Sequence, residues 1–227
     1  MSTRVAQLVT PGITYHLRNA IYVQLTEKAR ATTLLESRGP GFVMPATSGF
    51  KPLAAFHPEN EPTASDVIAA VESAFAAGYD TGEAASHEGD LRGLTFAGAG
   101  DPLERLDVLC EVSSHVRHIR PGTPIIVSTL GLIPSSEQPD IIHELVDNGV
   151  ERVSVLLNAS NPMEYNKIMK PKDGLTFQDV CSFIANCKEA GIATIATAAE
   201  NEKVSMSSVR ALANALGADF KSRSYHS

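Results

Sequence analysis

The chain has 227 residues, of which 43% are hydrophobic and 20% charged, and its net charge at pH 7 is −7. This composition is ordinary for one globular domain, and the acidic balance disfavours nucleic acid or an anionic membrane as main partner, because both need a basic face. No apolar run is long enough to cross a bilayer and the first residues contain no apolar signal region, so we expect a single domain over residues 1–227 that resides in the cytoplasm.

The first half of the chain is less regular than the second. Residues 20–25, with the sequence AIYVQL, predict a first strand, and residues 67–77 predict an Ala-rich amphipathic helix. Between them, residues 39–62 are rich in proline and glycine and have no period, which is usual for a functional or mobile segment. We therefore divide the domain into residues 18–62, the first strand with its irregular continuation, and residues 63–227, which carry regular repeats.

In the second half, short apolar runs alternate with stretches of helical spacing. The predicted strands are residues 94–97, 125–128, 153–157, 192–197 and, more weakly, 219–224; the predicted helices are residues 103–119, 140–146, 177–189 and 204–216. Continuous apolar runs are typical of a parallel sheet that is covered on both faces. Six predicted strands are too few to close an eight-stranded barrel, and an open, doubly wound sheet would have the same periodicity.

A glycine-containing turn follows the second predicted strand. In Gly98-Ala99-Gly100-Asp101-Pro102, the glycines would let a ligand approach the backbone amides, and the helix amino terminus that follows adds a positive field. Asp101 could accept hydrogen bonds from an ammonium group or cap the helix. On the turn alone, an ordinary strand-to-helix connection with Asp101 as the cap is the better interpretation.

Polar residues also follow the later strands, where parallel sheets bind their ligands. Ser128 and Asn158 stand at strand ends, Glu200 comes just past the fifth strand, and Lys170 opens a basic loop that suits a phosphate, a carboxylate or plain solvent. Helix capping and ordinary loop polarity are the simpler interpretations. The cysteines Cys110, Cys181 and Cys187 lie inside predicted helices without metal-ligand spacing, so we expect buried core residues.

In this order the segments resemble the radical S-adenosylmethionine superfamily, most nearly its TatD-associated group, over roughly residues 18–225. Gly98 to Pro102 resembles the family's Gly-x-Gly-Glu-Pro, which holds the methionine amino group of the cofactor, and Tyr165 to Gly174 resembles its Tyr-x-x-(Ile/Leu)-x-(Arg/Lys)-Pro stretch. The resemblance implies an α/β fold, an incomplete parallel (β/α)6 TIM-like barrel. It also implies a site for S-adenosylmethionine or a related nucleoside lined by Gly98, Ala99, Gly100, Asp101, Ser128 and Asn158.

One departure from the family concerns its iron–sulfur cluster. The family follows its first strand with three cysteines spaced C-x3-C-x2-C, and the corresponding positions here hold Ala29, Thr33 and Glu36. An iron–sulfur cluster needs thiolate ligands. We therefore predict no cluster, no other metal, and no reductive cleavage of the cofactor.

Three functions remain open. The first is a cluster-less pseudoenzyme that keeps a nucleoside pocket; the second is a non-radical lyase or transferase that uses Glu36, Lys170, Glu200 or Asp101 as acid–base groups. The third is a non-catalytic interaction protein. Convergence of the candidate residues on one cavity would favour the first two, whereas a filled pocket would favour the third.

The first and sixth predicted strands leave an open edge that would aggregate if it were bare. We expect residues 39–62 to fold over this edge, with a homodimer or another protein partner as the alternative cover. The apolar side chains available for this are Phe42, Val43, Met44, Phe50, Leu53 and Phe56.

Overall fold

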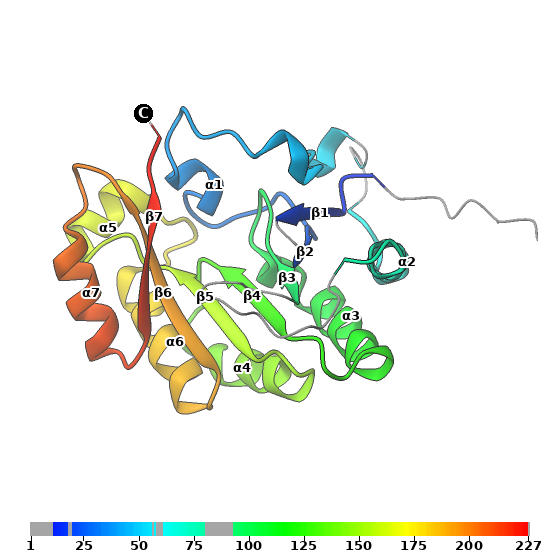
Figure 1. The fold of residues 1–227 in the computed structure, drawn as a ribbon. Coiled ribbons are helices and arrows are strands. Elements are labelled where there is room, and N and C mark those ends of the chain that lie inside the picture. The colour runs from blue at the N-terminus through cyan, green and yellow to red at the C-terminus, as the bar shows by residue number, and fades with distance from the viewer. Residues whose placement is uncertain (1–10, 18–19, 56, 58–60, 80–92, 227) are drawn as a thin grey trace, which may run out of the picture.

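The computed structural model describes residues 11–17, 20–55, 57, 61–79 and 93–226, and within them the chain folds around a seven-stranded sheet. The strands lie side by side in chain order: β1 (Thr14–Leu17), β2 (Ala20–Val23), β3 (Leu94–Phe96), β4 (Ile125–Thr129), β5 (Arg152–Leu156), β6 (Ala193–Glu200) and β7 (Asp219–Ser224) (Figure 1). β1 is antiparallel to β2, and every later neighbouring pair is parallel. Among the described residues β1 does not pair with β7, so the sheet is open.

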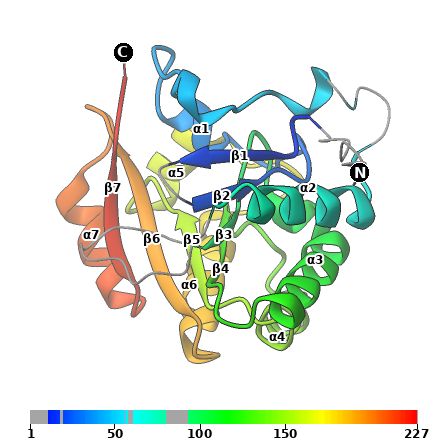
Figure 2. The same cartoon turned by 45° about the vertical axis from the view of Figure 1, so that its right-hand side comes forward.

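Helices follow the parallel strands and pack along one face of the sheet (Figures 1 and 2). They are α2 (Ala64–Ala76), α3 (Leu106–Ile119), α4 (Gln138–Asp147), α5 (Pro162–Met169), α6 (Phe177–Glu189) and α7 (Met206–Ala215). The four-residue α1 (Leu34–Ser37) and the 3-10 turns Ala46–Ser48 and Leu53–Ala55 lie above the carboxyl ends of the strands, and a further 3-10 turn, Pro102–Arg105, leads into α3. None of the helices in the described part of the chain has the length and apolarity to cross a membrane.

Successive strand residues alternate between this helical face and the opposite one, which we call the inner face. Val127 of β4 and Val155 of β5 are fully buried in the hydrophobic core between sheet and helices. On β7, Phe220 packs against the same core with the Arg210 guanidinium of α7 over its ring at 5.0 Å. Residues at odd positions on β7, including Arg223, therefore point to the inner face.

The predicted α/β class and each of the six predicted strands are confirmed. The predicted cysteines are also confirmed as buried and free; Cys110 lies in α3, and Cys181 and Cys187 lie in α6. α1, α5 and β1 were not predicted, because each is eight residues or shorter and shows too few turns or alternations for a period. Arg18, where the resemblance begins, and Phe56, one of the apolar residues expected to cover the open edge, lie outside the described residues.

The expected cover of the open edge needs correction. The hydrogen-bonding edge of β2 is paired with β1, with Tyr15 opposite Tyr22, and not with the described part of residues 39–62. A preceding strand satisfies backbone groups along its whole length, which an irregular proline-containing segment cannot do. The prediction missed β1 because four residues reading TYHL carry little strand signal.

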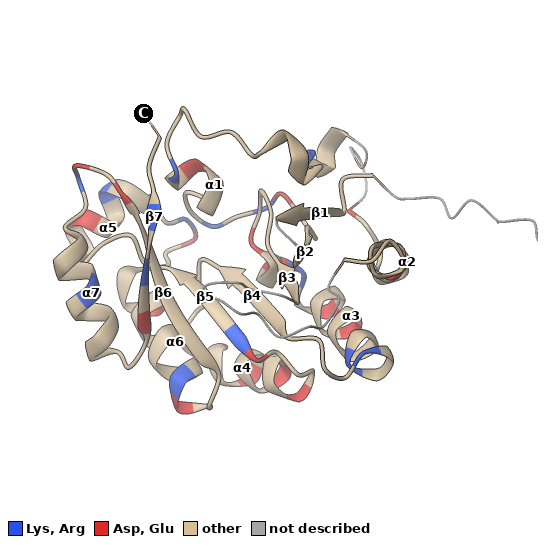
Figure 3. Ribbon diagram, viewed as in Figure 1, with Lys and Arg blue, Asp and Glu red and all other residues tan. Residues whose placement is uncertain are grey.

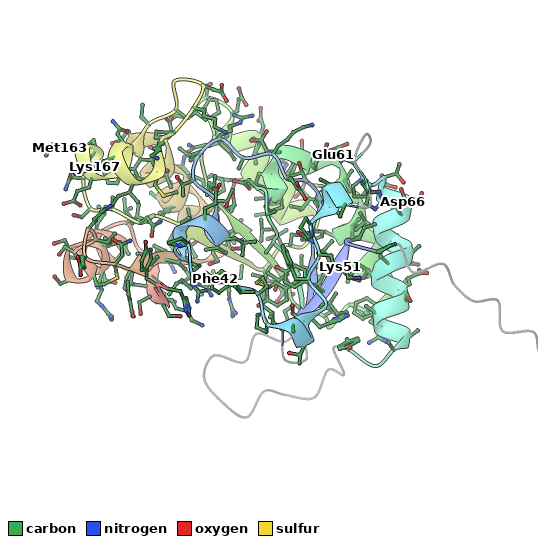
Figure 4. The ribbon with its side chains drawn as sticks, turned by 90° about the horizontal axis from the view of Figure 1, so that it is seen from above. Phe42, Lys51, Glu61, Asp66, Met163 and Lys167 are labelled. Carbon is green, nitrogen blue, oxygen red and sulfur yellow. The ribbon has the colours of Figure 1, made fainter. Side chains whose placement is uncertain are left out.

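Residues 38–53 instead cross the carboxyl ends of the strands (Figure 1). At one end the Arg38 Nε donates to the Ser224 carbonyl at 2.5 Å, and Gly41 N donates to the His226 carbonyl at 3.1 Å. At the other end the Phe50 ring meets the Tyr15 ring edge-on at 5.1 Å. Seen from above, Phe42 and Lys51 lie at separate points along this path (Figure 4). The segment thus links the two ends of the open sheet.

Candidate functional site

The turn after β3 places Asp101 in the protein interior. Its carboxylate accepts hydrogen bonds from the Thr129 hydroxyl at 2.8 and 2.9 Å, from Leu130 N at 2.9 Å and from Leu103 N at 3.1 Å. Burial raises the pKa of Asp101, while these donors act in the opposite direction. Asp101 therefore caps the turn Pro102–Arg105 and ties the β3 loop to the β4 loop, and its oxygens are already occupied by protein donors.

Gly98 and Gly100 have to be glycines because residues 24–28 pack against them too closely for a Cβ atom. A Cβ on Gly100 would lie 2.5 Å from the Lys28 carbonyl oxygen and 2.6 Å from that of Thr26. A Cβ on Gly98 would lie 2.7 Å from the Gln24 side chain. The loop that leaves β2 therefore packs directly against both glycines.

Gln24 is a residue that the sequence analysis missed. Its buried side chain donates from Nε2 to the Gly12 carbonyl at 2.7 Å and to the Lys51 carbonyl at 2.9 Å, and its Oε1 accepts from Ala99 N at 3.4 Å. A glutamine within the otherwise apolar predicted strand of residues 20–25 could have indicated that this side chain has a specific role. Gln24 connects the turn, the start of β1 and the segment over the strands, so it reinforces the filled state of the turn.

The cavity left beside the turn is very small. It has a volume of about 10 Å³ and is lined by Ala29, Thr33, Leu34, Ala97, Gly98, Gly100, Asp101, Ser128, Thr129 and Leu130. A volume of this order holds at most about one water molecule. Gly98, Gly100, Asp101 and Ser128 lie together, as the sequence analysis expected, but the cavity between them is too small for an organic ligand.

The three positions that correspond to the family's cluster cysteines have structural partners. Thr33 and Glu36 form a capping box at the start of α1: Thr33 N donates to the Glu36 carboxylate at 2.7 Å, and Glu36 N donates to the Thr33 hydroxyl at 3.3 Å. Ala29 packs against the hydrophobic core, and its carbonyl accepts from Lys172 Nζ at 3.0 Å. Among the described residues, no three His, Cys, Asp or Glu side chains form a group that could hold a metal ion.

A larger cleft lies on the other side of α1. It has a volume of about 620 Å³ and contains the three candidate acid–base residues, Glu36, Lys170 and Glu200, together with Thr32, Ser37, Lys167, Ile168, Asn201, Glu202, Lys203 and Tyr225. Figure 3 shows acidic and basic segments near one another on α1, on α5 and in the loop after β6. Lys170 ends α5 in the left-handed conformation, with φ of 50°. Within the described residues, neither Lys170 nor Glu200 has a side-chain hydrogen bond or ion pair.

Asn158 belongs to neither cavity. Its side chain is fully buried; Oδ1 accepts from Ala199 N at 2.8 Å, and the residue adopts a φ of 53°. Asparagine tolerates this left-handed conformation better than most residues do. The structure thus divides the candidates into a closed turn, an open charged cleft, and one buried strand connection.

Comparison with known proteins bears on the fold. No family model matches the chain, and no curated protein matches it. Among solved structures, the chain is similar to a structure of TYW1 with a lysine-pyruvate adduct bound, at 13% sequence identity and a TM-score of 0.56, over 97% of this chain and 69% of that chain. The likeness indicates that the two chains share the same α/β fold. At this level of identity the likeness shows the fold alone.

Proposed function

We propose that this chain is a cluster-less protein with a radical-SAM-type partial barrel, that it performs no radical chemistry, and that it binds a small polar ligand in the charged cleft. The observation that carries the proposal is the contrast between the two cavities. The turn that would hold the cofactor is filled, whereas Lys170 and Glu200 line a cleft of about 620 Å³ without partners among the described residues.

The loss of the cluster is supported by the positions of all possible sulfur ligands. The three cysteines are buried in α3 and α6, and burial raises the pKa of Cys187 to about 12, which disfavours the thiolate that iron would need. Thr33 and Glu36 hold each other in a capping box. A cluster at positions 29, 33 and 36 would have neither thiolate ligands nor a free loop.

The chemistry of the cleft suits a ligand that carries charges of both signs. Acidic side chains at Glu36, Glu200 and Glu202 stand with basic ones at Lys167, Lys170 and Lys203. An amino-acid group with its ammonium and carboxylate, such as the methionine end of S-adenosylmethionine or a related nucleoside, complements such a lining. We therefore propose that S-adenosylmethionine or a related nucleoside binds in this cleft and not at the glycine turn.

Two measurements test this function. After anaerobic treatment with iron and sulfide, the purified protein should retain no stoichiometric cluster, and near-full iron occupancy with the matching visible absorption would refute the first part. An Ala29→Cys/Thr33→Cys/Glu36→Cys variant is the control that shows whether the treatment can load this loop when thiols are present.

For the second part, calorimetry should detect binding of S-adenosylmethionine, S-adenosylhomocysteine or methionine to the wild type. Lys170→Ala and Glu200→Gln should each weaken that binding by about ten-fold or more, since each removes a charge-assisted contact. Lys188→Ala and Glu111→Gln change equally exposed residues outside the cleft and should leave it unchanged. Binding that is equal in all five proteins would exclude the cleft. Turnover of a bound ligand would indicate the non-radical enzyme.

A second candidate, an interaction protein, is favoured by an apolar groove next to the cleft. Its volume is about 690 Å³, its lining includes Leu35, Phe42, Val43, Met44 and Phe50, and Val43 is 80% exposed. Val43→Asp should abolish self-association in sedimentation experiments if this groove joins two copies. A wild type that is monomeric at every concentration would remove the homodimer from consideration.

A further inference from the structure

Arg223 on β7 is a charged residue of the inner face that none of the preceding functions uses. Its guanidinium reaches across the sheet to β5, where one terminal nitrogen donates to the Ser154 hydroxyl at 3.5 Å. Ser154 is itself 8% exposed and alternates with Val153 and Val155, which face the helices. A contact between strands two places apart is possible only over the concave side, so Arg223 and Ser154 share the inner face.

Arg223 is partly buried, and its guanidinium lacks the partners that a cation in such a position normally has. Its Nε is buried and has no hydrogen-bond acceptor, and the Ser154 contact is long for a hydrogen bond. Among the described residues, no carboxylate forms an ion pair with it. A charge that is partly withdrawn from water without a counter-charge is unfavourable, and native structures normally pair such groups.

Burial and a neighbouring cation both disfavour the unpaired positive charge of Arg223. Burial lowers the pKa of Arg223, and the nearby Tyr22 phenol opposes that shift. The positive charge of Arg223 also contributes to a lowered pKa of Arg38, so two cations are close together. Arg38 is already engaged, because its Nε and a terminal nitrogen donate to the carbonyl and hydroxyl of Ser224 and its guanidinium lies 4.4 Å from the Phe42 ring centre. One uncompensated positive charge therefore remains at Arg223.

We propose that Arg223 and Ser154 form a binding site for the carboxylate of a small organic acid on the inner face of the sheet. A guanidinium offers a planar fork of donors that matches a carboxylate, and a serine hydroxyl adds a donor beside it. One free positive charge matches a monoanion better than a phosphate dianion. Basic residues of β7 appear in blue in Figure 3. This site is separate from the charged cleft, whose lining reaches β7 only at Tyr225, just past its end, so it does not depend on the function proposed above.

The test measures the thermal unfolding of the full chain in sodium acetate, sodium propionate, sodium phosphate and sodium chloride at equal ionic strength. Relative to chloride, acetate or propionate at ten times its dissociation constant should raise the melting temperature of the wild type by about 4 °C. Arg223→Met should lose this shift and should melt in chloride at the wild-type temperature or above it, since the variant no longer holds a partly buried, unpaired charge.

Arg210→Met is the matched control, because Arg210 stacks on β7 from the helical face and should keep the full shift. No shift of the wild type in either carboxylate would overturn the proposal, as would a shift that Arg223→Met retains, or a shift in phosphate alone. If Arg223→Met fails to fold, two further measurements decide. Ser154→Ala should weaken acetate binding several-fold, and the Arg223 Nε–H resonance of the wild type should move during an acetate titration. A stationary resonance or unchanged acetate binding in Ser154→Ala would count against the site.

Discussion

The closed turn at Gly98 to Asp101 and the open cleft at Glu36, Lys170 and Glu200 lie on opposite sides of the same short segment. Thr33 and Leu34 line the cavity of the turn, whereas Thr32, Glu36 and Ser37 line the cleft. In the turn, the Asp101 carboxylate is saturated by protein donors and the cavity is about 10 Å³. In the cleft, the charged side chains of Lys170 and Glu200 have no partners in the described chain, and the volume is about 620 Å³.

This difference separates polar residues that hold the fold from those that are free to bind. A carboxylate inside the protein is tolerated only with donors around it, so its substitution should affect stability. A solvated charge at a cleft contributes little to stability, so its substitution should affect binding. The following predictions test this separation by the free energy of unfolding.

Asp101→Ala should have the largest effect. The substitution leaves the Thr129 hydroxyl and the Leu103 and Leu130 amides without an acceptor in the interior. At the usual cost of a buried unsatisfied group, the free energy of unfolding should fall by about 3–5 kcal/mol, measured by urea denaturation. Asp140→Ala, an exposed change in α4, should cost less than about 1 kcal/mol. Equal small losses in both variants would mean that Asp101 is not a structural residue.

Gly100→Ala should come next. The new Cβ would overlap the carbonyl oxygens of Thr26 and Lys28, which are backbone atoms and cannot move aside cheaply. Overpacking of this kind costs about 1–3 kcal/mol. Gly122→Ala is a fitting control, because its Cβ would meet nothing within 4 Å, and it should leave stability within about 0.5 kcal/mol. A stable Gly100→Ala protein would show that the turn has room that the structure does not contain.

The pH dependence of stability gives a third comparison, between the wild type and Asp101→Asn. Because burial raises the pKa of Asp101, the native state binds the proton more tightly than the unfolded chain does. The contribution of this group is fully present below its unfolded pKa of about 3.9 and is lost as pH rises through the higher native pKa, by at most about 1.4 kcal/mol per pH unit. In urea denaturation at several pH values, the free energy of unfolding of the wild type should therefore fall relative to that of Asp101→Asn as pH increases. The opposite slope would mean that the surrounding donors outweigh burial.

Thr33→Ala should have a moderate effect. It removes the hydroxyl that caps α1 and half of the capping box, which typically costs about 1 kcal/mol. Thr47→Ala, at an exposed threonine with no capping role, should cost less. The comparison by thermal or urea unfolding tests whether position 33 now serves the fold. A Thr33→Ala protein as stable as the wild type would weaken that assignment.

Lys170→Ala and Glu200→Gln should have the smallest effects on stability. Each changes an exposed side chain that has no partner among the described residues, so the free energy of unfolding should stay within about 0.5 kcal/mol of the wild type. The same two proteins should show the largest losses in ligand calorimetry. A destabilised variant with unchanged ligand binding would mean that Lys170 or Glu200, like Asp101, stabilises the fold. The turn and the cleft would then not differ in function.

The sequence by itself determined the order of strands and helices, because apolar spacing is a local property. Continuous apolar runs such as residues 125–128 predicted buried strands, and the alternation of strand and helix predicted the parallel pairing that is observed from β2 to β7. The choice between a barrel-like order and a doubly wound order was left open by the periodicity. The same reasoning brought the strand-end residues Gly98, Asp101 and Ser128 to one edge of the sheet, since parallel strands end together.

Only the tertiary structure decided what each of these residues does. Whether Gly100 faces a ligand or a backbone depends on the loop at residues 26–28, which is more than seventy positions away in the chain. Pairing of β2 with β1, and the contact between Arg223 and Ser154 across the inner face, also depend on non-local approach that no local period records. A polar residue stabilises the fold when donors, acceptors and backbone atoms from distant parts of the chain fill the space around it, and it can bind a ligand when they do not. Only the packing of the whole chain determines which of these applies.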